Sequence, residues 1–486
     1  MATASDVPAS SADTKAPPPR LSLWDAVSII VGVVIGAGLY ETAPLVLSNV
    51  SGPGAAFGVW FLGGLLSLIG ACCYAELATT YPRLGGDYVY LSRAFGPWAG
   101  FLFAWSQLAV LLTGSIGMMA YVFADYAAGF GAEGGTVRTL LACAVVVGLT
   151  GLNIASVGAG KAAQNALTWI KVGGLAAVAG VGFYWASVEV APPAPPPSAA
   201  AESSLGLAMI LVLYTYGGWN DAAFVAAEVK DRGRNMPRAL LIGTGVITLV
   251  YLVVNAAFIA VLGFDGARSS RAIAADVLSR PFGSAGGQLM SALVMVSALG
   301  AVNALILTGA RVHAGLGADY SALSALGRWH PRRRSPIGAL LAQALVTLGL
   351  IALLGTRPGR LAVDSALGAV GLRPAEWTGH GGFDTLLRCT APVFWLFFLM
   401  TSVALFVLRH KDRDLVRPFR VPLYPFLPLV FSGTCLYMLI SAIDYAGSLS
   451  LVGASLMLLG LPLYFASKQR PVAALGEPDP ASSAAE

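Results

Sequence analysis

The chain has 486 residues, of which 56% are hydrophobic and 11% are charged, whereas a typical soluble protein is about 45–50% apolar and about 25% charged. A mean hydropathy of +0.72 excludes a soluble enzyme, a disordered protein and a nucleic-acid binder. A net charge of +5 is too small to indicate an anionic polymer as a partner. The composition therefore predicts an all-α polytopic membrane protein.

The two ends of the chain differ from the rest. Residues 1–20 contain no apolar segment of the signal-peptide kind, so the first span is expected to act as the insertion signal. Residues 1–20 and 471–486 are rich in Ala, Ser and Pro, which predicts disordered tails. The five cysteines lie in or beside apolar stretches without metal-ligand spacing or a readable disulfide pattern. The sequence predicts neither a metal site nor a cofactor.

Twelve stretches are long and apolar enough to cross a membrane, which takes about 20 residues. An even number of spans places both ends of the chain on the same side. The predicted spans lie near 24–45, 53–76, 97–127, 138–157, 162–186, 205–228, 239–263, 286–312, 336–356, 386–408, 423–443 and 446–467.

The basic residues indicate which side that is. With these spans, twenty Lys and Arg residues fall in the tails and loops of one side and seven in the loops of the other. Three more, Lys171, Arg311 and Arg388, lie inside spans. Because basic loops favour the cytoplasm, both termini are predicted to be cytoplasmic.

A proline-rich segment divides the spans. Residues 191–197 read APPAPPP, which forms neither helix nor sheet and predicts a stiff extracellular linker over 191–204. Five spans precede it (21–190), five follow it (205–409), and two more end the chain (410–470).

The first and sixth spans both contain glycine interruptions, at Gly32, Gly36 and Gly38 and at Gly217-Gly218. Glycine-broken segments at matching places in two halves indicate the binding site of a transporter. The alternative is that these glycines only let helices pack closely.

Four motifs in this region and beyond follow one another along the chain. They are Gly32–Tyr40 (GVVIGAGLY); Tyr74–Tyr90 (YAELATTYPRLGGDYVY) with Ala94–Pro97 (AFGP); Tyr216–Asn220 (YGGWN) with Glu228 and Asn235–Ala239 (NMPRA); and Arg417–Pro425 (RPFRVPLYP). The first resembles the broken first helix of amino-acid permeases of the amino acid–polyamine–organocation superfamily. The others are similar to the second span, the sixth span and the approach to span eleven in its L-type amino-acid-transporter branch and bacterial members. The likeness runs in order from about 21 to 467.

The resemblance implies a fold of five plus five inverted spans (LeuT-like) with two additional C-terminal helices, in which helices 1 and 6 are broken. The substrate would lie at the midplane, between the broken helices. By the family pattern, amides around Gly36, Ala37 and Gly38 would hold a carboxylate. The carbonyls of Val34, Ile35, Tyr214 and Gly217 would hold an ammonium, since unwound helix ends offer free N–H and C=O groups.

Side chains facing the gap would select the substrate. Tyr214 occupies the place of the family's gating aromatic residue, and Trp219, Asn220 and Ser115 match positions beside the ligand. For Trp219 and Ser115 ordinary packing is the alternative. Ala37 stands where many relatives have Ser, which removes one hydroxyl contact to the carboxylate and leaves the substrate range open.

Lys171 lies deep in the fifth span, where a charge costs about 2.5–3.5 kcal/mol on insertion scales. The family carries a lysine near the place where sodium-coupled relatives hold a sodium ion. Lys171 is therefore interpreted as a coupling residue, which favours sodium-independent exchange or proton coupling. The alternative is a lysine that snorkels to an interface.

Three other charges are hypotheses. Glu41 and Arg388 would face each other across the external vestibule as an outer gate, or would be a vestibule charge and a snorkelling arginine. Asp221, next to Asn220, could anchor the second amine of a cationic amino acid or polyamine, or could point toward another span.

The expected function is secondary-active transport of amino acids, most simply neutral L-amino acids, by alternating access across a plasma membrane. Only six of the 30 basic residues are lysines, which is typical of a GC-rich bacterial genome and so indicates the bacterial inner membrane. In the L-type branch that the chain resembles, animal members join a heavy subunit through a cysteine between spans three and four. The corresponding loop at 128–137 has no cysteine, so no disulfide-linked heavy subunit is expected. The rival classes are a membrane enzyme, for which the four histidines are too scattered, a channel and a non-transporting amino-acid sensor.

Overall fold

The computed structural model describes residues 21–36, 38–81, 85–131, 134–155, 157–188, 204–220, 229–270, 272–330, 335–377 and 381–467. Within these ranges the chain is helical, with two isolated β-bridges and no strand. The helices are α1 (Leu23–Val34), α2 (Gly38–Ser48), α3 (Pro53–Thr80), α4 (Asp87–Phe95), α5 (Pro97–Ser106), η1 (Gln107–Leu111), α6 (Leu112–Tyr126), η2 (Ala127–Phe130), α7 (Gly135–Ala155), α8 (Val157–Val188), α9 (Leu205–Thr215), α10 (Arg232–Ser269), α11 (Ile273–Asp319), η4 (Ser321–Leu323), α12 (Ile337–Gly355), α13 (Arg357–Ala369), α14 (Gly382–Lys411), α15 (Phe426–Ala446), α16 (Leu449–Leu458) and α17 (Gly460–Ala466).

The prediction of an all-α protein with many membrane spans is confirmed. In the described part of the chain nine helices are long and apolar enough to cross a membrane, or ten if the bent pair α1 and α2 forms one span. The predicted spans near 162–186 and 205–228 correspond to shorter apolar helical stretches, Gly173–Trp185 and Leu205–Thr215. The total of twelve spans stays a prediction.

The first span is interrupted where its glycines predict. α1 begins with a capping box, in which the Ser22 hydroxyl accepts from the Asp25 N–H (3.2 Å) and the Asp25 carboxylate accepts from the Ser22 N–H (2.8 Å). The helix ends at Val34, and α2 starts at Gly38 with its axis bent by 57° from that of α1. The bend leaves backbone groups of both helices without intrahelical partners.

A second interruption follows α9. This helix runs from Leu205 to Thr215, and the hydroxyl of its N-cap residue Ser204 accepts from the Leu207 N–H (3.3 Å). Gly218 has φ of +107°, a conformation that favours glycine, and a Cβ there would come within 3.1 Å of the Val33 side chain. The remainder of the predicted sixth span, 221–228, lies outside the described residues.

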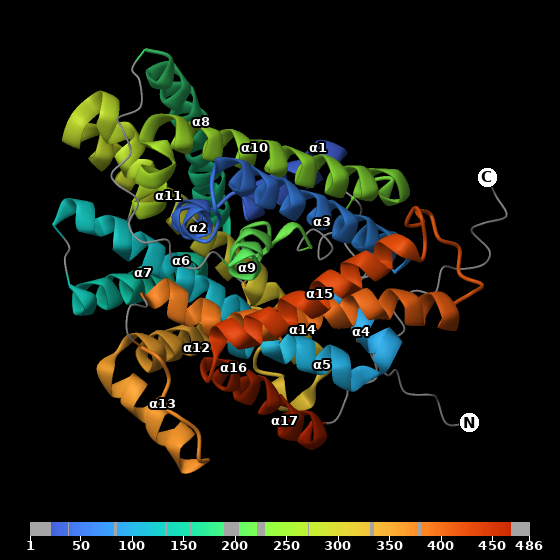
Figure 1. The fold of residues 1–486 in the computed structure, drawn as a ribbon. Coiled ribbons are helices and arrows are strands. Elements are labelled where there is room, and N and C mark those ends of the chain that lie inside the picture. Colours follow the sequence, from blue (N-terminus) through green and yellow to red (C-terminus); the bar gives the residue numbers. More distant parts are fainter. Residues whose placement is uncertain are drawn as a thin grey trace, which may run out of the picture.

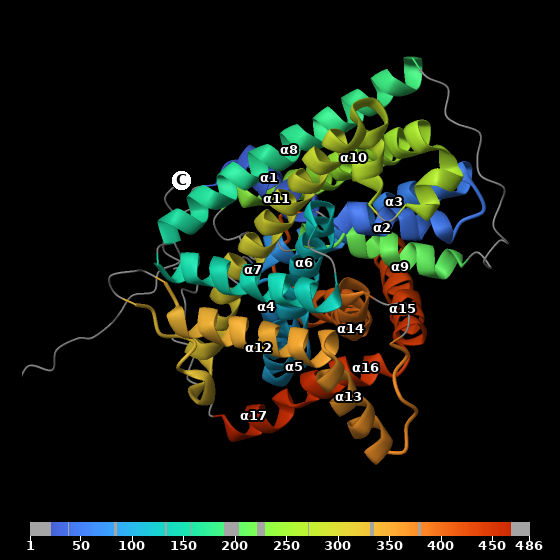
Figure 2. The same cartoon turned by 90° about the vertical axis from the view of Figure 1, so that its left-hand side faces the viewer.

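The interrupted segments occupy the middle of the helical bundle. α2 packs against α9, and α10 runs along α1, α3 and α8 (Figure 1). α14 packs between α15 and α6, and α8 lies on the opposite edge of the molecule from α16 and α17 (Figure 2). The long helices therefore form a frame around the two breaks.

Two helices were not predicted as elements. α4 buries Tyr90 and Leu91 but has only 9 residues, too few for a span. α13 starts at the Thr356 cap and buries Val363 and Leu367 on one face, while its other positions are mostly exposed. Both are short amphipathic segments, which a search for apolar stretches does not detect.

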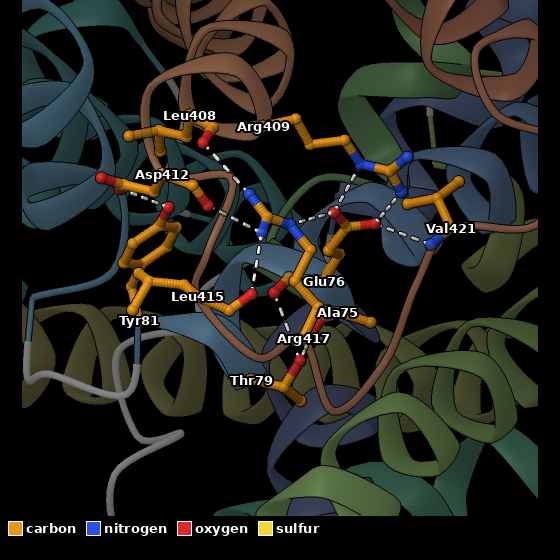
Figure 3. A network of polar contacts seen from close by, with 10 residues as sticks. All are labelled: Ala75, Glu76, Thr79, Tyr81, Leu408, Arg409, Asp412, Leu415, Arg417 and Val421. Atoms are coloured by element: carbon orange, nitrogen blue, oxygen red, sulfur yellow. Dashed lines mark hydrogen bonds and ion pairs between the residues drawn. The ribbon is translucent and has the colours of Figure 1, made fainter.

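A buried ionic cluster joins the ends of α3 and α14 to the segment that precedes α15 (Figure 3). Glu76 is 1% exposed and accepts two hydrogen bonds from Arg409, one of them at 2.7 Å. The Arg417 guanidinium lies 3.3 Å from the same carboxylate, and the Val421 N–H donates to it at 2.7 Å. Glu76 therefore neutralises two arginines and fixes the connecting segment to α3.

A second, more exposed pair lies beside this cluster. Arg93 donates to the Asp412 carboxylate, with Nη2 3.0 Å from Oδ1, and the Tyr81 hydroxyl donates to it at 2.7 Å. The Arg93 guanidinium holds the pKa of the Asp412 carboxyl below its ordinary value, and the Tyr81 hydroxyl acts in the same direction. The Arg93 side chain is 44% exposed, so solvent screens this pair.

We expect Glu76→Gln to lower the free energy of unfolding by about 3–5 kcal/mol, because it leaves two buried guanidiniums without their shared counter-charge. The matched control, Asp412→Asn, removes the neighbouring exposed pair and should cost less than about 1 kcal/mol. Denaturation of both variants in the same detergent provides the measurement. If both variants lost the same free energy of unfolding, Glu76 would not be what holds the two arginines and the connecting segment in place.

Candidate functional site

A cavity of about 180 Å³ lies at the two helix breaks. A single water needs only roughly 10–15 Å³ on this measure, so the cavity has room for a small solute. Its walls are mostly apolar, with backbone at the glycines and a few polar side chains. The lining residues are Val33, Val34, Gly36, Gly38, Thr42, Tyr74, Asp87, Phe103, Gln107, Leu111, Leu112, Ser115, Met119, Tyr214, Thr215, Gly217, Gly218, Asn220, Ala301, Ala304, Leu305, Thr308, Phe394, Phe397 and Phe398.

Tyr251 of α10 connects the two breaks. Its hydroxyl lies 2.9 Å from the Val34 carbonyl oxygen and 3.0 Å from that of Thr215, the last residues of α1 and α9. A hydroxyl carries one hydrogen, so the two carbonyls share it. The Thr42 and Thr215 hydroxyls are 2.8 Å apart and join α2 to α9. Carbonyls freed by both breaks are thus partly satisfied within the protein.

Lys171 of α8 reaches the same end of α1. Its Nζ donates to the Gly32 carbonyl at 3.2 Å, and the residue is only 2% exposed. Among the described residues no carboxylate forms an ion pair with it. A cation is favourable at a helix C-terminus, where the carbonyl dipoles concentrate negative charge.

Aromatic side chains form one wall of the cavity. Tyr214 contacts Phe394, with ring centroids 6.1 Å apart, and Phe394 contacts Phe398 at 4.4 Å. Trp219 packs on Phe398 and, edge-on at 5.1 Å, on Tyr74. It is 3% exposed and does not line the cavity in this conformation, so its place beside a substrate stays a prediction with packing as the alternative.

The cavity brings together most of the predicted binding residues. Ile35 is buried beside the break without lining the cavity, and Ala37 and Asp221 lie outside the described residues. Asn220 folds back on the second break, where its Oδ1 accepts from the Gly218 N–H at 3.3 Å. The predicted residues that do line the cavity are Val34, Gly36, Gly38, Ser115, Tyr214, Gly217 and Asn220.

The two gate candidates have other neighbours in this conformation. Glu41 lies within electrostatic range of Asp125 and Arg138, which pair at 3.3 Å. Arg388 pairs with Asp384 at 2.9 Å and donates to the Tyr445 carbonyl at 2.9 Å. In the part of the chain that the structure describes, no ion pair joins Glu41 to Arg388. Their closing on each other stays a hypothesis.

The sequence analysis missed three residues at this site. Tyr251 sits in an unbroken apolar run and gives no signal. Gln107 lines the cavity from η1, a π-helical turn that no sequence pattern predicted. Turns of this kind are frequent at functional sites. Asp87 also lines the cavity, and it belongs to the motif Tyr74–Tyr90, in which no binding residue was predicted. Within the described ranges no three His, Cys, Asp or Glu side chains come together as metal ligands.

Comparison with known proteins identifies similar chains over nearly the whole length. A family model described as "Amino acid permease" matches residues 21–463. The chain is 28% identical to the mouse b(0,+)-type amino acid transporter 1 over 454 residues (92% of this chain, 87% of that protein). It is 29% identical to the mouse large neutral amino acids transporter small subunit 2 over 464 residues (92% and 80%). The serine/threonine exchanger SteT of Bacillus subtilis is 27% identical over 460 residues (93% and 97%).

We expect Tyr251→Phe to loosen both breaks, because the carbonyls of Val34 and Thr215 lose their shared donor. Removing one such hydrogen bond costs about 1 kcal/mol, or about fivefold in the local opening equilibrium. Amide hydrogen exchange around 34–38 and 215–218 should accelerate by that factor. The control is Tyr320→Phe, which removes a buried hydroxyl bonded to the Pro97 carbonyl at 3.3 Å, away from both breaks. Similar acceleration at both breaks in the control would contradict the bridging role.

Proposed function

The chain belongs to the amino acid permease family, and from that premise we propose that it is a secondary-active carrier of neutral L-amino acids that works by alternating access. The family and the similar proteins are membrane transporters, so the chain is a membrane transporter and not an enzyme. The observation that carries the proposal is the cavity at the two helix breaks, with backbone at Gly36, Gly38 and Gly217 in its lining.

The proposed architecture has twelve spans, five plus five in inverted repeat and two more, with both termini in the cytoplasm of a bacterial cell. The order of the breaks supports it, because α1–α2 opens the first group and α9 opens the second. Discontinuous helices at matching positions are the usual sign of an inverted-repeat transporter.

Backbone groups would recognise the parts that all amino acids share. The start of α2 offers amides and the positive end of its dipole to a carboxylate at Gly36 to Gly38. The end of α1 offers carbonyls to an ammonium, and the Val34 carbonyl keeps a second lone pair beside the Tyr251 bond. Tyr214 and Phe394 border the space left for the side chain, which suits an apolar group.

Lys171 supports transport without sodium. Its ammonium occupies the negative end of α1, where a bound cation would otherwise be favourable. If the Lys171 charge takes the place of a sodium ion, the energy for transport would come from exchange of one amino acid for another or from proton coupling.

A cationic amino acid or polyamine anchored by Asp221 is the second candidate substrate, and a non-transporting sensor is a less favoured function. One relative's name contains "large neutral amino acids" and another's "serine/threonine exchanger", which favours neutral substrates. The loop at 128–137, without cysteine, favours a carrier with no disulfide-linked subunit.

Uptake of labelled amino acids into proteoliposomes in sodium-free buffer tests the proposal. We expect uptake of leucine, alanine or serine that is stimulated by internal amino acid or by an inward proton gradient. The first stimulation would identify an exchanger and the second a symporter. A strict sodium requirement would contradict the role of Lys171, and binding without flux would favour a sensor.

Lys171→Gln tests that role directly. The variant keeps a donor but removes the charge, and a hydrogen bond to a charged group contributes about 1.5–3 kcal/mol, so we expect a roughly 10- to 100-fold slower uptake. Lys230→Gln, which removes an exposed lysine, should leave uptake unchanged. Full activity of the Lys171 variant would show that the charge is dispensable.

A further inference from the structure

The third predicted span contains a π-helical turn, η1, between α5 and α6. The Gln107 carbonyl accepts from the Leu112 N–H, five residues further along the chain. This turn holds one residue more than an α-helical turn, so it rotates α5 against α6 by about 100°. From Ser106 to Gly114, all of which the structure describes, only Gln107 is not buried, and it lines the cavity.

The rotation decides which side chains share the cavity wall. Phe103, Gln107 and Ser115 all line the cavity. A continuous α-helix would set Gln107 about 80° and Phe103 about 120° away from Ser115 around the helix axis. With one residue taken up by the π-helical turn, both lie about 20° from Ser115. The turn therefore keeps the two halves of this span directed toward the cavity.

His313 of α11 is buried against the same turn. It is 0% exposed, and α11 packs along α5, η1 and α6. Gly309 and His313 are four residues apart and share a helix face. A Cβ on Gly309 would meet the Leu112 side chain at 3.3 Å, which places this face at the end of η1. The His313 ring approaches the backbone of Gln107.

The His313 ring and the Gln107 carbonyl complement each other. Among the described residues neither ring nitrogen has a partner within full hydrogen-bond geometry. A neutral imidazole carries one N–H donor, and an unpaired donor in the protein interior is unfavourable. A carbonyl oxygen has two lone pairs, and the Leu112 N–H uses one of those on Gln107. The second lone pair is therefore an acceptor for the ring.

We propose that His313 is a positioning residue of the transport site: its N–H donates to the Gln107 carbonyl, holds η1 in its π-helical form and so keeps the Gln107 side chain in the cavity wall. Gln107 meets the substrate, and His313 acts only through it. The inference rests on the proposed function for its link to transport, whereas the bond itself can be tested without transport.

Amide hydrogen exchange tests the bond. His313→Leu removes both nitrogens, and His313→Gln keeps an amide donor. We expect exchange at 111–113 to accelerate about fivefold in His313→Leu, as for the loss of one hydrogen bond, and less than about twofold in His313→Gln. The control is Ser297→Ala, which changes a buried hydroxyl on the same helix and should leave this exchange unchanged. Equal acceleration in both His313 variants would overturn the donor role.

Uptake into sodium-free proteoliposomes tests the link to the site, with whichever of labelled leucine, alanine and serine the wild-type chain takes up fastest. His313→Leu should raise KM about fivefold and leave the maximal rate nearly unchanged. His313→Gln should restore KM. In the double variant with Gln107→Leu, KM should not exceed that of Gln107→Leu alone, because His313 acts through Gln107. Effects that multiply in the double variant would assign His313 a structural role and overturn the proposal.

The two measurements separate the inference from its premise. If the wild-type chain takes up none of the three amino acids, the proposed function fails, and hydrogen exchange still decides whether the bond exists. If uptake is normal and exchange at 111–113 is unchanged in His313→Leu, the inference is wrong and the proposed function stands. His313→Phe, which keeps a ring without nitrogens, takes the place of His313→Leu if that variant does not fold, with the same expected results.

Discussion

A helix that is broken inside a membrane exposes backbone groups that water cannot reach, and each of them needs a partner from the protein or from a ligand. This constraint organises the centre of the molecule. The Tyr251 hydroxyl serves the carbonyls of Val34 and Thr215, and the Lys171 ammonium serves that of Gly32. The groups that these side chains leave free are the ones available to a substrate.

Two groups of ion pairs among the described residues lie at helix ends, away from that centre. Glu76 holds Arg409 and Arg417 where α3 and α14 end, and Arg388 is paired with Asp384 near the start of α14. These pairs fasten the ends of the frame without placing charge against the breaks. Since pairs at helix ends hold the frame, the interrupted segments are free to remain irregular around the cavity.

Much of the fold could be predicted from the sequence, because span positions follow from local hydropathy and the two breaks from local glycines. The partners across helices could not. Tyr251 lies in an apolar run, and its hydroxyl reaches the carbonyls of Val34 and Thr215 only because of the rotation of α10 against both breaks. Trp219 follows the second break in the chain, yet it packs behind the cavity wall for the same reason. Residue order indicates which segment forms the site, whereas helix packing decides which side chains face it.

Recognition in such a cavity divides naturally into two parts. In the proposed function, backbone groups at the breaks would meet the α-carboxylate and α-ammonium, which every amino acid carries, and would contribute affinity without discrimination. In the proposed function, discrimination would fall to the side chains that line the cavity, among them Tyr214 and Phe394, whose ring centroids lie 6.1 Å apart.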